Sequence, residues 1–88
     1  MNFNKGDIIT GECGCIGTYI ERYDKHSAIV DYIYLKCSDG SIETRCILDN
    51  PVLSTEQEVF EFKKKLIRSG YKYNNKTKKV ERYEQSEF

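Results

Sequence analysis

The chain has 88 residues, of which 39% are hydrophobic and 32% are charged. This balance is typical of a folded domain, and the length allows one small domain with little room for an enclosed substrate pocket. No apolar run approaches the roughly 20 residues that span a bilayer, and the first residues lack the pattern of a secretion signal. We therefore expect a cytoplasmic protein with one domain over residues 1–84 and a frayed tail at 85–88.

The formal net charge is zero, but the charges are unevenly distributed. Residues 1–61 contain five Lys/Arg and eleven Asp/Glu, whereas residues 62–82 contain nine Lys/Arg and one Glu. Such asymmetry indicates a nucleic acid or an acidic partner, but it also lets two parts of one domain attract each other. The sequence leaves both interpretations standing.

The first half of the chain reads as a series of short strands. Residues 6–10 and 18–21 are predicted strands, and residues 28–37 form the strongest one, rich in Ile, Val and Tyr. The glycines at 11, 14 and 17 suggest a bulge or a close backbone approach. The sequence therefore predicts an α+β fold, built on a small antiparallel β-barrel or curled sheet of SH3-like size.

The Asp39–Gly40 pair predicts a two-residue type I′ turn, which fixes the pairing of the strands around it. In that register Tyr34 faces Arg45 and Ile33 faces Cys46. The predicted core face carries Ile33, Leu35, Cys37, Ile42, Thr44 and Cys46, and the predicted outer face carries Tyr32, Tyr34, Lys36, Glu43 and Arg45. Tyr and Arg are enriched at protein interfaces, so Tyr32, Tyr34 and Arg45 are the candidate residues for binding a protein partner.

A helix is predicted after Pro51, with Ser54 as its N-cap and Gly70 at its end. Its predicted core-facing stripe contains Val59, Phe60, Phe62, Leu66 and Ile67. Lys63 falls inside this stripe, where it is either a long side chain that reaches out to water or a functional cation. A C-terminal β-hairpin follows, with strands at 71–74 and 79–83, in which Tyr71, Tyr73 and Val80 supply the ordered side.

No arrangement of residues predicts catalysis or metal binding. A zinc site of Cys13, Cys15, Cys37 and Cys46 is the third and least favoured alternative, because the hairpin register separates Cys37 from Cys46 by roughly 13 Å, too far for one zinc ion unless that strand pair is bulged or the turn differs. The only histidine, His26, lies in a predicted turn, and no pair of carboxylates has a spacing that suggests shared acid and base work. We therefore expect no enzyme activity, no catalytic or metal-binding residues and no cofactor.

The basic C-terminal segment favours a second function. Cations interleaved with stacking rings are typical of proteins that bind single-stranded nucleic acid. The candidate nucleic-acid residues are Lys72, Tyr73, Lys76, Lys78, Lys79 and Arg82. The alternative is that the tyrosines cover a core and the lysines fill an exposed hairpin.

Several motifs also carry a resemblance that covers most of the chain. They are Phe3-x-x-Gly6-Asp7-Ile8-Ile9, the long strand before Asp39–Gly40, Leu53-Ser54-Thr55-Glu56-x-Glu58, and Leu66-x-x-x-Gly70-Tyr71-x-Tyr73-Asn74. The chain resembles small uncharacterised proteins carried by bacteriophages and integrated mobile elements. The resemblance implies an accessory role in a phage or mobile element, such as binding a host or defence protein, and it supplies no site residues. The small size, the lack of a reactive site and the predicted outer Tyr/Arg face favour a non-catalytic protein-interaction module for that role. Relatives of this kind often have tryptophan at the position of Tyr73, which suits a structural aromatic.

Overall fold

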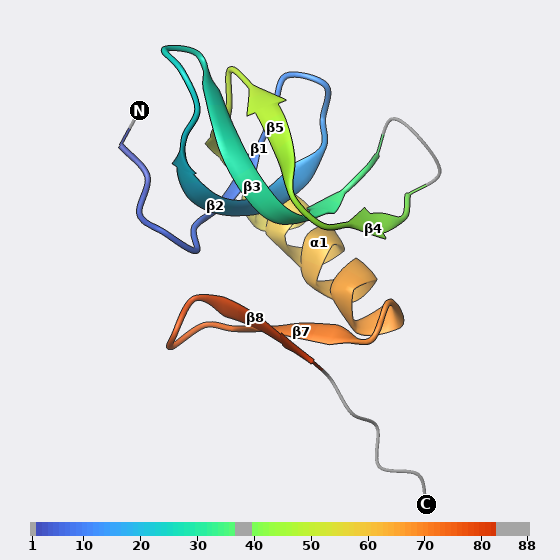
Figure 1. Cartoon of the computed structure of the whole chain (residues 1–88). Helices are drawn as coiled ribbons and strands as arrows, with labels where there is room; N and C mark the ends of the chain where they lie inside the picture. Colours follow the sequence, from blue (N-terminus) through green and yellow to red (C-terminus); the bar gives the residue numbers. More distant parts are fainter. Residues whose placement is uncertain (1, 37–39, 83–88) are drawn as a thin grey trace, which may run out of the picture.

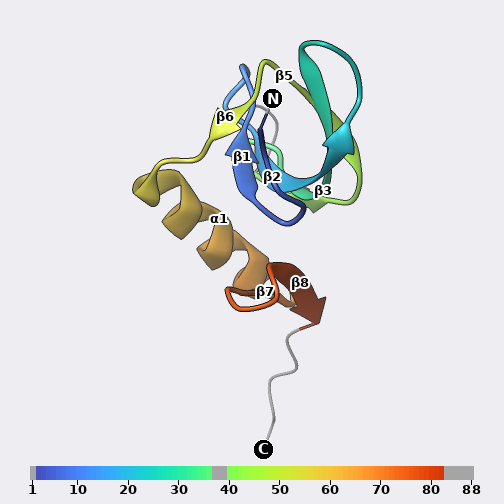
Figure 2. The same ribbon diagram turned by 90° about the vertical axis from the view of Figure 1, so that its left-hand side faces the viewer.

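The chain has an α+β fold, in which a curled antiparallel sheet is covered on one side by a helix and a hairpin (Figure 1). The computed structural model describes residues 2–36 and 40–82. The view turned by 90° shows the same layering, with the helix and the hairpin both below the sheet (Figure 2). The predicted α+β class is therefore confirmed. The prediction for the tail at 85–88 lies outside the described residues.

The sheet is six-stranded over the described residues, in the order β4-β3-β2-β1-β6, with β5 pairing with β3 as well. The strands are β1 (Ile8–Thr10), β2 (Ile16–Arg22), β3 (Ser27–Tyr34), β4 (Ile42–Glu43), β5 (Cys46–Asp49) and β6 (Val52–Leu53). They are followed by α1 (Glu56–Arg68) and the hairpin β7 (Tyr71–Asn74) and β8 (Lys79–Arg82). The consecutive strands β5 and β6 pair with two different strands of the sheet, β5 with β3 and β6 with β1. Because only two residues connect them, the sheet has to curl so that β1 and β3 approach each other. This described strand path is not closed, so the structure shows the curled sheet but not a barrel.

Two hydrophobic clusters lie on opposite faces of this sheet. The first contains Ile9, Cys15, Ala28, Val30, Ile33 and Leu48. The second contains Ile8, Ile16, Phe62 and Leu66, so it joins the sheet to α1. Because neighbouring residues of a strand point to opposite faces, Ile8 and Ile9 of β1 serve different clusters. The curled sheet and its loops enclose the first cluster themselves, and α1 with the hairpin covers the second.

The glycines that precede and enter β2 allow close packing, as the sequence predicts. A Cβ at Gly17 would lie 2.9 Å from Val30, and one at Gly11 would lie 2.9 Å from a methyl carbon of Leu48. These positions therefore bring the backbone of the loop and of β2 directly against the first cluster.

The predicted register of the hairpin around Asp39–Gly40 is wrong. Tyr34 pairs with Ile42 and Ile33 with Glu43, a shift of three residues from the prediction. The backbone N–H of Gly40 donates to the carbonyl of Leu35 at 3.0 Å, so the connection is longer than a two-residue turn. An odd shift moves a strand's side chains to the other face, which is why Ile42 packs in the second cluster and not in the first. The prediction for Cys37 lies outside the described residues.

Two residues near this pairing have unusual backbone angles, and two other predicted core residues are found where the sequence places them. Tyr32 in β3 and Arg45 before β5 both have positive φ angles, 52° and 35°. β3 pairs with β5 in the same register as with β4, so Val30 lies opposite Cys46. Ile33 lies in the first cluster and Cys46 packs against it, as predicted.

The helix begins one residue later than the sequence predicts, because Thr55 is its N-cap. The backbone N–H of Glu58 donates to Thr55 Oγ1 at 3.2 Å, and the N–H of Thr55 donates to Glu58 Oε1 at 2.8 Å. Ser54, the predicted cap, instead shares a 2.7 Å hydrogen bond with the hydroxyl of Thr10 in β1. Ser54 thus ties the helix start to the sheet while Thr55 caps it.

The core-facing stripe of α1 is narrower than predicted. Phe62 and Leu66 are fully buried and Val59 packs against the same cluster. Phe60 and Ile67, however, are 61% and 49% exposed. Their assignment to the core is therefore wrong, and the outward side of α1 presents two large apolar side chains.

Candidate functional site

The β7–β8 hairpin is clamped onto the N-terminal turn of the chain. The hydroxyl of Tyr73 donates a 2.6 Å hydrogen bond to the carbonyl of Gly6. Lys78 Nζ lies 2.9 Å from Asp7 Oδ1 in an ion pair. The ring of Tyr71 packs against that of Tyr32, with 5.0 Å between the centroids. These contacts make the hairpin part of the folded domain. They confirm the prediction that the side of the hairpin with Tyr71 and Tyr73 packs against the rest of the protein.

The charges in this clamp are stabilised by their surroundings. The hydrogen bond and the charge of Asp7 raise the pKa of Lys78. Partial burial of Asp7 acts to raise its own pKa, but the hydrogen bonds from Asn4 and Lys78 outweigh it and the pKa is lowered. Burial raises the pKa of Tyr73. At neutral pH the ion pair is therefore fully charged and the phenol is a neutral donor.

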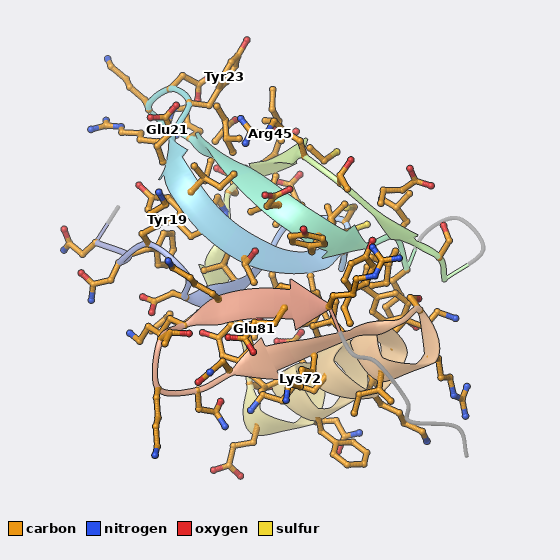
Figure 3. The ribbon with its side chains drawn as sticks, turned by 60° about the horizontal axis from the view of Figure 1, so that its bottom comes forward. Tyr19, Glu21, Tyr23, Arg45, Lys72 and Glu81 are labelled. Carbon is orange, nitrogen blue, oxygen red and sulfur yellow. The ribbon has the colours of Figure 1, made fainter. Side chains whose placement is uncertain are left out.

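The three residues predicted to bind a protein partner do not share an open face. Tyr32 and Tyr34 are half-buried and pack against the second cluster, beneath the helix and hairpin layer. Arg45 is exposed, its backbone N–H donates to Asp31 Oδ1, and it lies far from the labelled hairpin residues Lys72 and Glu81 (Figure 3). The premise of an open Tyr/Arg face is wrong, because the layer that covers it comes from the C-terminal half. Partner binding by these residues stays a prediction.

The candidate nucleic-acid residues divide into two groups. Tyr73 and Lys78 belong to the clamp, whereas Lys72, Lys76, Lys79 and Arg82 are exposed. On the outward face of the hairpin, however, Lys72 lies directly across from Glu81 (Figure 3). Glu81 also accepts a 3.1 Å hydrogen bond from the Asn74 side chain. The carboxylate of Glu81 therefore lies among the lysines of the outward face of the hairpin and reduces the positive charge of that face.

An open groove of about 430 Å³ runs between the sheet and the hairpin. Its lining brings Tyr32 of β3 together with Lys78 and Lys79 of the hairpin, two residues from the other candidate set. Lys5 lines it as well, although it lies more than 70 positions from Lys78 in the sequence. No local pattern could have joined Lys5 to this group, because only the clamp brings the N-terminal turn to the hairpin.

A second candidate surface is the outward face of α1, defined by Phe60, Lys64 and Ile67. Phe60 and Ile67 are seven residues apart, so they lie on the same side of the helix two turns from each other. Lys64 lies between them, with its Nζ 5.9 Å from the centroid of the Phe60 ring. Beside this face Glu61, Lys65 and Arg68 line a shallow hollow of about 210 Å³ with Tyr34. The face combines apolar side chains with a basic surround.

Side chains that could bind a metal ion are not clustered over residues 2–36 and 40–82. In that part of the chain no group of three or more His, Cys, Asp or Glu side chains could hold a metal ion. Cys13 is exposed, Cys15 is buried in the first cluster, and Cys46 is half-buried against it. No helix in these two ranges is long and apolar enough to cross a membrane.

Comparisons with protein-family models, with curated proteins and with solved structures found no match to this chain. The function is therefore argued from the two surfaces.

Proposed function

We propose that this chain is a non-catalytic protein-interaction module that binds through the outward face of α1. The observation that carries the proposal is the exposure of Phe60 and Ile67, at 61% and 49%. Large apolar side chains that share one exposed face mark interaction sites more often than scattered ones do. A Phe that anchors in a partner's pocket is a typical source of binding energy at such interfaces.

The charges around these anchors indicate the chemistry of the partner. Lys64 lies over the ring of Phe60, and Arg68 follows in the last turn of the helix. Cations at the rim of an interface steer a negatively charged partner and repel a positively charged one. The expected partner is therefore a protein face or helix that presents an apolar groove bordered by Asp and Glu.

A second copy of this chain fits the face less well. If two copies paired antiparallel, with Phe60 of one over Ile67 of the other, the two Lys64 side chains would meet near the centre. Like charges placed against each other at an interface are unfavourable. An acidic partner avoids this repulsion. A role in a bacteriophage or mobile element, with a host or defence protein as that partner, is supported only by the resemblance of the sequence motifs.

The test compares two double variants in affinity capture from nuclease-treated bacterial lysate. Phe60→Ala with Ile67→Ala removes the proposed anchors. Val52→Ala with Leu53→Ala is the matched control, because both side chains are apolar and 61% exposed but lie on β6. We expect the α1 variant to lose a partner that the wild type and the β6 variant retain.

Both variants should fold like the wild type, since exposed substitutions usually change stability by no more than about 0.5 kcal/mol. Circular dichroism checks this. A partner that is retained by the folded α1 variant, or lost equally by the β6 variant, contradicts the proposal.

A further inference from the structure

We infer that the groove between the sheet and the β7–β8 hairpin binds a single-stranded nucleic acid. This site is separate from the outward face of α1, so it does not depend on the protein-interaction proposal. It is built by the clamp that holds the hairpin to the N-terminal turn.

The first reason is the charge of the groove. Lys5, Lys78 and Lys79 line it together with the carboxylate of Asp31, and the charge of Lys78 is paired with Asp7 just beside the groove. Lys5 comes from the N-terminal turn and Lys79 from the hairpin, which the clamp brings together. Lys78 is held in place by Asp7, whereas Lys5 and Lys79 are exposed and, among the described residues, form no ion pair. Two exposed cations suit successive phosphates of a flexible strand.

The second reason is the apolar part of the lining. Tyr32, Ile20 and Val80 line the groove together with the lysines. Aromatic rings and apolar side chains in a basic groove are the platforms on which single-stranded binders stack bases. Tyr73 does not line the groove, because its hydroxyl is bonded to Gly6 and its ring lies under Lys63, 5.5 Å from the Nζ. Tyr32 does line it, and because its ring is held in place by packing against Tyr71, it supplies a fixed aromatic wall.

The third reason is the contrast with the outward face of the hairpin. There Lys72 is opposed by Glu81, which would meet a phosphate backbone with a like charge. The groove has a volume of about 430 Å³, within the range of sites that hold ligands of nucleotide size. A single strand can place one or two bases in such a space, whereas a duplex keeps its bases stacked and paired. An acidic peptide would satisfy the lysines but would not use the apolar lining.

The experiment measures binding of a fluorescently labelled oligothymidine to the full chain by polarisation, at two or more salt concentrations. Lys5→Ala with Lys79→Ala removes the two exposed cations of the groove. The matched control is Lys72→Ala with Lys76→Ala, which removes the same charge from exposed hairpin positions that do not line the groove. A Glu-rich peptide of similar length serves as the competing ligand class.

We expect the groove variant to bind about tenfold more weakly at about 50 mM salt, and its salt slope to fall by about 1.4, since each phosphate contact to a single strand contributes about 0.7. The control variant should change affinity by less than about twofold, because its lysines lie outside the groove. Equal weakening by both variants would mean diffuse attraction and would overturn the inference. So would the absence of oligothymidine binding at low salt, or binding of the Glu-rich peptide alone. Circular dichroism establishes that each variant is folded.

Discussion

The clamp between the hairpin and the N-terminal turn depends on the absence of a side chain at Gly6. This residue has a φ angle of +93°, which L-residues rarely adopt. A Cβ at Gly6 would lie 2.1 Å from the carbonyl oxygen of Lys78 and 2.6 Å from the Lys78 Cβ. Both atoms belong to the hairpin turn and neither can swing aside as a side-chain end could. Gly6→Ala therefore forces the turn away from the sheet.

Gly70 offers a matched control, because its φ angle is almost the same, +92°, but a Cβ there meets nothing within 4 Å. Gly70→Ala should cost only the backbone strain of a left-handed conformation, about 1–2 kcal/mol. Gly6→Ala adds the displacement of packed atoms, about 1–3 kcal/mol. It also weakens the hydrogen bond between Tyr73 and the Gly6 carbonyl, worth about 1 kcal/mol. The expected total is about 3–6 kcal/mol for Gly6→Ala.

Urea unfolding followed by circular dichroism gives both free energies on the same scale. Hydrogen exchange adds a local readout: in Gly6→Ala the amides of β7 and β8 should lose protection before those of β3, whereas Gly70→Ala should leave this order unchanged. Equal destabilisation by the two substitutions would refute the reasoning, since the backbone strain is shared and only the contact with Lys78 differs.

Three further substitutions probe the contacts around α1 and the clamp. Tyr73→Phe leaves a half-buried carbonyl without its donor and should lower the free energy of unfolding by about 1–2 kcal/mol in urea titrations, whereas Tyr23→Phe, on an exposed ring, should change it by less than about 0.5 kcal/mol. Thr55→Ala removes the N-cap and should cost about 1 kcal/mol, with a melting temperature lower by roughly 4–8 °C; an unchanged melting curve would mean that another residue caps the helix. The pKa of Asp7 is lowered from 3.8, so its contribution is present above that value and is lost as the pH falls through the folded-state pKa. Asp7→Asn should therefore flatten part of the acid-side decline in the urea midpoint, and a decline identical to that of the wild type would contradict the role of the Lys78 pair.

The elements of this fold could be predicted from local sequence, but the register between them could not. A run rich in Ile, Val and Tyr predicts β3, and Gly70 after a periodic segment predicts the end of α1, because these signals act over a few neighbouring positions. The pairing of β3 with β4 depends on how the chain turns between Tyr34 and Ile42. The Asp39–Gly40 signal indicates one turn type, and the observed hydrogen bond from Gly40 to Leu35 selects a longer connection.

The candidate surfaces were harder to predict because they depend on which layer covers which face. Tyr32 and Tyr34 were placed on the correct side of β3, yet the helix and the hairpin pack over that side. Phe60 and Ile67 were assigned to the core by a helical wheel, which gives the direction of a side chain but not the width of the neighbouring layer. Composition and periodicity carry no information on such long-range packing.

The uneven charge of the sequence now has a more specific interpretation. Among the described residues one ion pair, Lys78 with Asp7, joins the basic C-terminal part to the acidic N-terminal part. Attraction between the two parts of the domain therefore neutralises few of the basic side chains. Lysines remain exposed both beside Phe60 on α1 and along the groove. Both candidate surfaces thus favour negatively charged partners, and association at either one should weaken as salt rises. What separates them is the apolar component: removal of Phe60 and Ile67 should affect only the protein partner, and removal of Lys5 and Lys79 only the nucleic acid.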